Sequence, residues 1–217
     1  MRKEILRYKV SIDTDTNFND NDYIEQKVTQ DYKINILIQN DDTETVEYIG
    51  EMDITIFDLK YSYMAYEDET MLAFDLEGET ADLYESFYYN GYKYIFDGYI
   101  DILDMISECT KEEKMELIKK EHIVYLRNLY IYKEYRGKGY GKEVLRNLEK
   151  VLRYIFNLNI NSIIGIASPS VKNDEGFEFT NSKKEKEQLK DLLTKNNYIF
   201  LTKKKVSDYF IKSFLVY

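Results

Sequence analysis

LYIYKEYRGKGYGK, residues 129–142, is the stretch that decides the fold, and the helical sequence EVLRNLEKVLRYIF follows it directly. It opens as a β-strand, passes an arginine and three glycines at every second position, and then shows apolar residues at helical spacing. The glycines are Gly137, Gly139 and Gly141, and the helical apolar positions are Val144, Leu145, Leu148, Val151, Leu152 and Ile155. Such a strand, glycine turn and helix start form an anion cradle, because glycines let the backbone approach a ligand and the first helical N–H groups point at it.

The spacing of the glycines tests which phosphate ligand fits this cradle. The P-loop of nucleotide hydrolases needs glycine where Arg136 stands and Ser or Thr where Glu143 stands, so it fails twice. A dinucleotide-binding fingerprint needs its third glycine where Lys142 stands, so it fails once. The alternative without a ligand is a glycine-rich turn that only reverses the chain.

One pattern does fit: R-x-x-G-x-G, preceded by L-x-x-L-x-I at Leu126, Leu129 and Ile131. It resembles the coenzyme-A pyrophosphate loop of the GNAT superfamily of N-acetyltransferases. The resemblance implies acetyl-CoA as the acyl-donor substrate, with its pantetheine arm on the strand backbone and its pyrophosphate on the loop N–H groups. The cofactor-binding residues it implies are Leu129, Tyr130, Ile131, Arg136, Gly137, Lys138, Gly139, Tyr140, Gly141 and Lys142.

The order of elements after residue 121 is also similar to a GNAT domain: strand, loop, helix, strand, helix, strand, strand. The resemblance implies an α/β (α+β) GNAT fold, a mixed central sheet flanked by helices and splayed open between the strands that begin at His122 and Ile160. We expect one domain over residues 1–217, with a cofactor-binding core at about 122–217 and an acceptor-side part at about 1–121. Within the latter, a helical stretch at about 60–120 is longer than a minimal member needs, and we interpret it as an insertion that covers the acceptor site.

Periodicity supplies the remaining elements. Strands are predicted over residues 5–12, 34–38, 46–59, 122–132, 160–167, 198–201 and 209–217, and a helix over 184–196. Between the strand at 160–167 and this helix, SVKNDEGFEFTNSKK reads as a polar loop. Gly50 inside a strand predicts a bulge or a close backbone approach.

Composition limits the setting and the partners. The single cysteine, Cys109, fits a reducing compartment, and no apolar run of about 18 residues predicts a membrane span, so a cytoplasmic protein is expected. The net charge of −10 argues against a nucleic-acid partner. The charge is uneven, because residues 1–110 hold 8 Lys/Arg against 26 Asp/Glu whereas residues 111–217 hold 22 against 14. This is either a solvated acidic surface, or a basic half for a polyanionic cofactor beside an acidic half for a cationic small-molecule or peptide amine. The oligomeric state stays open.

The catalytic groups are less clear. Family members often carry F-Y-x-x-x-G-F, whose Tyr protonates the departing thiolate; here the pattern falls on LLTKNNY, with Leu193 at the Tyr position and Asn197 at the Gly position. The catalytic residues are therefore unknown. The candidates are Ser168, which could reach the cofactor sulfur, and Asn173, at a place where family members often have an Asn that faces the pantetheine; in the alternative both are surface-loop residues.

The base that must deprotonate the amine is equally open. The strand position where some members place Glu corresponds to Arg127 or Asn128, neither of which is a base. Asp53, or Asp75 and Glu79 in the inserted stretch, could act through water, and the sole histidine, His122, reads as structural. No metal is expected, because the acidic loop at residues 13–22 lacks the glycine and terminal glutamate of an EF-hand.

The function predicted is an acetyl-CoA-dependent N-acetyltransferase acting on a primary, cationic amine. The alternative is a catalytically weak or inactive GNAT-like module that binds CoA as a regulator, which Leu193 favours. A third hypothesis, a toxin-type acetylase of aminoacyl-tRNA, is disfavoured by the acidic charge.

Overall fold

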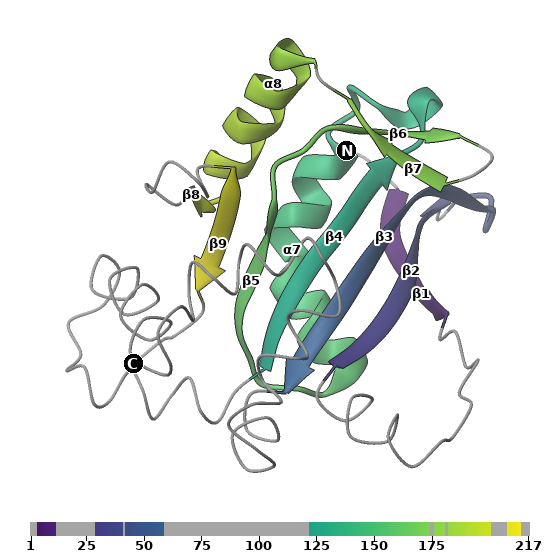
Figure 1. The fold of residues 1–217 in the computed structure, drawn as a ribbon. Coiled ribbons are helices and arrows are strands. Elements are labelled where there is room, and N and C mark those ends of the chain that lie inside the picture. Colours follow the sequence, from purple (N-terminus) through teal and green to yellow (C-terminus); the bar gives the residue numbers. More distant parts are fainter. Residues whose placement is uncertain are drawn as a thin grey trace, which may run out of the picture.

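The structure is a computed structural model that describes residues 4–11, 29–40, 42–58, 122–173, 176–180, 182–200 and 208–213. Its main element is a seven-stranded mixed sheet in the order β1-β2-β3-β4-β5-β9-β8 (Figure 1). β4 and β5 run parallel, and the other neighbouring strands run antiparallel. The strand bounds are β1 Glu4–Ser11, β2 Thr29–Asn40, β3 Val46–Asp58, β4 His122–Ile131, β5 Ile160–Ile166, β8 Ile199–Phe200 and β9 Tyr209–Ser213.

These elements confirm the α/β class and the mixed sheet flanked by helices. Each strand predicted from apolar periodicity forms within the described residues, and residues 201 and 214–217 of the last two predicted strands lie outside them. The predicted helical insertion at about 60–120 lies outside the described residues, as do Asp75, Glu79 and Cys109. No helix in the described ranges is long and apolar enough to cross a membrane.

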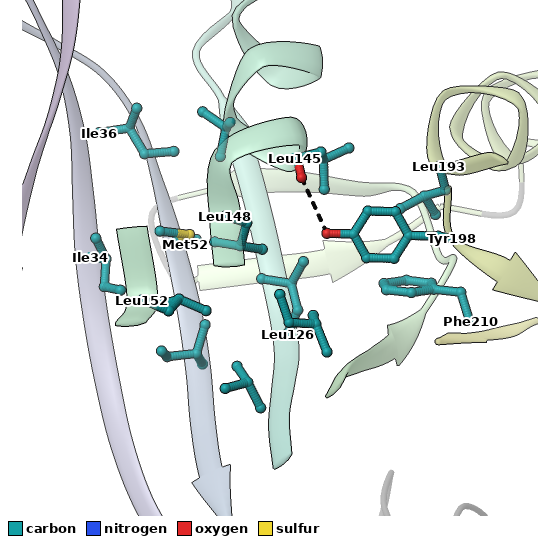
Figure 2. Close-up of a cluster of buried hydrophobic side chains, with 14 of the residues drawn as sticks. Ile34, Ile36, Met52, Leu126, Leu145, Leu148, Leu152, Leu193, Tyr198 and Phe210 are labelled. Carbon is teal, nitrogen blue, oxygen red and sulfur yellow. Dashed lines mark hydrogen bonds between the residues drawn. The ribbon is translucent and has the colours of Figure 1, made fainter. Parts of the chain in front are cut away.

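Helix α7, Tyr140–Phe156, covers one face of the sheet and buries its apolar side there (Figure 1). Figure 2 shows this core, where side chains from β2, β3 and β4 meet those of α7. The labelled sheet residues are Ile34, Ile36, Met52 and Leu126, and those of α7 are Leu145, Leu148 and Leu152. Each fully buried aliphatic side chain of this kind contributes about 1.5–3 kcal/mol, so the core fixes α7, and with it the glycine loop, against β4.

Helix α8, Lys183–Thr194, joins the same core at its C-terminal end. It begins at Ser182, whose hydroxyl accepts a hydrogen bond from the Glu185 N–H at 3.3 Å, a normal N-cap. Beyond its end, the Tyr198 hydroxyl donates to the Leu145 carbonyl oxygen at 3.4 Å (Figure 2). This contact ties the end of α8 to α7.

The expected polar loop after β5 is wrong. Residues there form a small two-stranded antiparallel sheet, β6 Ser170–Asn173 and β7 Gly176–Phe179. This β6–β7 hairpin lies across the carboxyl-terminal end of β4 (Figure 1). A contact with a distant strand stabilises the hairpin, because Lys172 donates a hydrogen bond to the carboxylate of Glu51 on β3. Local periodicity therefore carries little sign of it.

Gly50 marks a close approach of two backbones, as predicted. A Cβ at this position would lie 2.3 Å from the carbonyl oxygen of Tyr130 on β4. The strand register also shifts between Ile36 and Leu37 on β2, opposite this part of β3. Only glycine lets β3 pass so close to the far end of β4.

Candidate active site

The site is a cleft that opens where β4 separates from β5. The parallel register of β4 with β5 ends at Leu126 and Gly165, whereas its register with β3 continues to Ile131. The strands meet closely at the last pair, because a Cβ on Gly165 would lie 2.9 Å from the Leu126 carbonyl oxygen. Beyond it the cleft has a volume of about 320 Å³. The splayed sheet expected between these two strands is therefore present.

The walls of the cleft differ in character. β4 supplies its residues 126–131, mostly through the strand edge, and residues 168–170 close the opposite side after β5. The α8 wall combines three leucines with two polar residues, namely Leu189, Leu192, Leu193, Glu185 and Gln188. Such a channel suits a ligand with an apolar arm that carries amide groups, because the strand edge offers N–H and C=O groups to it.

The glycine loop closes the outer end of the cleft. Gly137 and Gly139 have φ of +75° and +88°, a left-handed backbone that a Cβ would strain. Gly139 is the N-cap of α7 and offers no side-chain cap, so the first N–H groups of the helix remain for a ligand. Arg136 is held beside them, with its Nε donating to the Ile131 carbonyl at 2.8 Å and its guanidinium 4.8 Å from the Tyr130 ring centroid.

The ten cofactor residues expected from sequence fall into two groups. Those that line the cleft are Leu129, Tyr130, Ile131, Arg136 and Gly141. The others, Gly137, Lys138, Gly139, Tyr140 and Lys142, belong to the loop and the helix start around its outer end. The Tyr140 side chain turns into the core, where its hydroxyl donates to Glu4 Oε2 at 2.6 Å, so only its backbone is placed for an anion.

The candidates for protonating a thiolate also separate. Ser168 lines the cleft, and its N–H donates to the Ile166 carbonyl at 2.9 Å. Asn173 ends β6, three residues past Ser170, which is the last cleft residue on that side. Leu193 lines the cleft and is only 2% exposed, so an apolar side chain occupies the position of the family tyrosine.

Asn197 replaces the glycine of the family pattern but adopts a backbone conformation that glycine also adopts. Its φ is +66°, the left-handed conformation that glycine adopts freely and that asparagine tolerates better than other residues. The turn after α8 is therefore kept, and Tyr198 still enters the core.

A bulge in β4 lies at the inner end of the cleft. Asp53 pairs with Asn128 and Ile54 with Leu126, so Arg127 is the extra residue. Arg127 Nη1 lies 3.3 Å from Asp31 Oδ2, and Asn128 Nδ2 donates to Asp53 Oδ2 at 3.3 Å. The bulge thus directs two polar side chains toward carboxylates of β2 and β3.

Sequence reasoning missed Glu51, a carboxylate of β3 that is 2% exposed. Its Oε2 lies 2.9 Å from Lys33 Nζ, and Lys172 of the β6–β7 hairpin contacts its Oε1. Burial alone would raise the pKa of Glu51, but the hydrogen bonds from Lys172 and Lys33 outweigh it and lower the pKa. No local signal identifies this residue, because strand alternation does not tell which face will be covered.

His122 begins β4, and its Nε2 lies 3.6 Å from Asp58 Oδ2, at the end of β4 away from the loop. Within the described ranges, no group of three or more His, Cys, Asp or Glu side chains is placed to hold a metal ion.

Among curated proteins, none matches this sequence. Several solved structures are similar to it, among them the following three. One is the KacTA–DNA complex, at 10% identity and a TM-score of 0.41, with 96% of this chain and 93% of that chain covered. Another is a mutant of the AtaT toxin bound to the C-terminus of the antitoxin AtaR and acetyl-CoA, at 10% identity and a TM-score of 0.37, with 96% and 93% covered. The third is the mosquito arylalkylamine N-acetyltransferase like 5b, at 10% identity and a TM-score of 0.35, with 92% and 82% covered.

Two of these structures correct the partners expected from the sequence. One is a complex with DNA, and the other contains a segment of an antitoxin. The exclusion of nucleic acid is withdrawn.

The family itself follows from the sequence match together with the sheet, the splayed cleft and the glycine loop. The Acetyltransferase (GNAT) family matches residues 54–164, just over half of the chain, from within β3 to within β5. The chain belongs to the GNAT family of acetyltransferases.

Proposed function

We propose that this protein is an acetyl-CoA-dependent N-acetyltransferase that acetylates a primary amine. The observation that carries the proposal is the cleft between β4 and β5, with the glycine loop and the uncapped start of α7 at its outer end. A strand edge for an amide-containing arm and an anion cradle for a pyrophosphate are the two features that acetyl-CoA needs.

The residues that would hold acetyl-CoA follow from this geometry. The edge of β4 over residues 129–131 would bind the pantetheine amides, and the N–H groups of residues 136–142 would bind the pyrophosphate. Arg136 adds a fixed positive charge at the same place. When bound, acetyl-CoA supplies the activated acyl group.

The protein must then remove a proton from the amine and stabilise the negative charge that develops on the carbonyl oxygen. The attacking amine has to be neutral, which requires a proton acceptor on the acceptor side. A backbone N–H at the bulged part of β4 is suited to stabilise the carbonyl oxygen as it becomes negative. Leu193 has no proton to give, so the proton for the departing sulfur comes from water or from a polar group such as Ser168.

Calorimetry and a thiol-release assay test the proposal in sequence. We expect acetyl-CoA to bind with a dissociation constant below about 100 µM, equivalent to roughly −5.5 kcal/mol. We also expect free CoA to appear when an amine acceptor from a panel of polyamines, lysine peptides and peptide α-amines is added. Absence of acetyl-CoA binding would sink the proposal.

The CoA-binding regulator remains a second candidate because of Leu193, which is buried where the family often has a proton donor. A regulator of that kind would bind acetyl-CoA in the calorimeter yet release no thiol with any amine of the panel. The two functions are therefore separated by the second assay alone.

The organisation and setting of the chain are part of the same proposal. We take residues 1–217 as one domain, in which residues 122–217 bind the cofactor and residues 1–121 form the acceptor side. A cytoplasmic setting fits the single cysteine of the sequence.

A further inference from the structure

Three carboxylates lie on the sheet face opposite α7, beside the part of β4 that lines the cleft. They are Asp31 of β2 and Glu51 and Asp53 of β3. Alternation places them on this face, because the intervening β3 residues Met52 and Ile54 belong to the core beneath α7. The face carrying these carboxylates borders the cleft through Asn128, which both lines the cleft and donates to Asp53.

Two of the three carboxylates already have strong partners. Asp31 accepts a hydrogen bond from the Thr55 hydroxyl at 2.6 Å and forms an ion pair with Arg127. Glu51 is held by Lys33 and by Lys172. Their negative charges are therefore compensated inside the fold, and neither is suited to bind another cation.

Asp53 differs from both. Within the described part of the chain, Asp53 accepts one side-chain hydrogen bond, from the neutral amide of Asn128 to Oδ2 at 3.3 Å. Its Oδ1 is left to accept from a ligand. The bulge at Arg127 brings Asn128 opposite Asp53, so this carboxylate stands one strand away from the point where β4 leaves β5.

Lys33 is the cation that faces Asp53 from β2, since the two residues are partners in the strand register. The pKa of Lys33 is raised chiefly by its hydrogen bond to Glu51, and to a smaller degree by the charge of Asp53. The Lys33 ammonium nitrogen therefore pairs with Glu51, whose Oε2 lies 2.9 Å away. Asp53 interacts with the same positive charge only at longer range.

We propose that Asp53 is the carboxylate that receives the acceptor amine as an ammonium ion and takes its proton. This rests on the proposed function and names its substrate class: an aliphatic primary amine that is positively charged in solution and enters from the sheet face opposite α7. Asn128 is the positioning residue that orients the carboxylate toward the cleft.

The chemistry balances without a further reactant. The ammonium nitrogen gives one proton to Asp53 Oδ1, directly or across one water, and Asp53 later returns it to solvent. The freed lone pair forms the new C–N bond with the acetyl carbonyl carbon, and the C–S bond breaks. The second nitrogen proton passes through water to the sulfur, so the products are an amide, a thiol and one released proton.

Asp53→Asn is the direct test, because asparagine keeps the size of the side chain and an oxygen that accepts from Asn128. Asp58→Asn is the matched control, the same substitution at the other end of β3. We expect both variants to bind acetyl-CoA within twofold of the wild type. Spermidine, used as the probe on CoA-saturated protein in calorimetry, should bind at least tenfold more weakly to Asp53→Asn, and unchanged to Asp58→Asn.

A pH profile distinguishes a proton acceptor from a merely structural residue. With the carboxylate present, kcat/KM for spermidine should be nearly flat around neutral pH, because the ammonium form binds and gives its proton to the carboxylate. In Asp53→Asn it should rise about tenfold per pH unit, following the neutral amine. Asp53→Glu, which keeps the charge, should restore part of the binding.

Three results overturn this inference: wild type that does not bind spermidine, Asp53→Asn that binds it equally well, or an equal loss in Asp58→Asn. The proposed function fails on a different result, the absence of acetyl-CoA binding or of thiol release by the wild type. The two failures are thus distinguishable.

Discussion

Substituting alanine separately at Gly139 and Gly141 gives opposite predictions for two glycines two residues apart. At Gly139, φ is +88° and a Cβ would contact nothing within 4 Å, so only the backbone conformation resists the change. A left-handed conformation costs a residue with a Cβ about 1–2 kcal/mol. Gly141 lies in the first turn of α7 without positive φ, and its Cβ would meet Ile131 Cγ1 at an ordinary 3.7 Å. There alanine should gain about 0.5–1 kcal/mol.

The two variants should therefore differ by roughly 2 kcal/mol in the free energy of unfolding, or about 4–8 °C in Tm for a chain of this size. Urea unfolding followed by circular dichroism measures the difference, with the wild type between the two variants. Calorimetry should show that Gly139→Ala binds acetyl-CoA up to about tenfold more weakly than the wild type. The loss arises if the free loop relaxes out of the strained conformation and must return to it on binding. The reasoning is refuted if Gly139→Ala unfolds at the wild-type urea concentration, or if Gly141→Ala is the more damaging.

The other predictions concern the far end of β4, the loop and the hairpin. Gly50→Ala should lose about 1–3 kcal/mol in urea unfolding, because its Cβ would fall 2.3 Å from the Tyr130 carbonyl oxygen; unchanged stability would mean that the strands separate freely. Arg136→Lys keeps the charge but loses the Nε hydrogen bond and the ring contact, so acetyl-CoA should bind about tenfold more weakly in calorimetry, whereas equal affinity would show that charge alone suffices. Lys172→Met should cost about 1–2 kcal/mol at pH 7 through its lost bond to Glu51. Because the folded pKa of Glu51 is lowered, its stabilisation is full above the unfolded pKa of about 4.3 and is lost as the pH falls through the folded value. The variant should therefore lose less stability on the acid side than the wild type, and a parallel pH profile would contradict this.

The part of the fold that sequence predicts well is the part whose signals are local. β4, the glycine loop, α7 and β5 follow one another along residues 122–166, and each is encoded by its own periodicity or by glycine. The positive φ angles of the loop are likewise a local property, since glycine is the residue that adopts them without strain. This is why the glycine loop and the strand and helix on either side of it could be predicted by residue number.

The proposed acceptor side depends on contacts between distant residues, which no local sequence pattern predicts. The bulge at Arg127 has no glycine or proline to announce it and is defined only by the register against β3. Glu51 is compensated by Lys172, which lies 121 residues further along the chain. The β6–β7 hairpin, expected to be a loop, is fixed by the same contact. Residues distant in sequence therefore determine which carboxylates form ion pairs and which one, Asp53, accepts only a hydrogen bond from a neutral amide.

In the proposed enzyme, the relative cost of the two proton transfers makes a proton donor at Leu193 less important than a base for the amine. A thiol with a pKa of about 8.5 is only about 1.5 units above neutral pH, so leaving as a thiolate costs about 2 kcal/mol. An aliphatic amine with a pKa of about 10.4 is roughly 3.4 units above neutral pH, so only about one molecule in 2,500 is neutral, a cost of about 5 kcal/mol. The amine therefore needs assistance far more than the sulfur does. The chain has apolar Leu193 where a donor for the sulfur would stand, and Asp53 on the sheet face where we propose that the amine binds. We therefore expect the loss of Asp53 to slow acetyl transfer more than a tyrosine at position 193 would speed it.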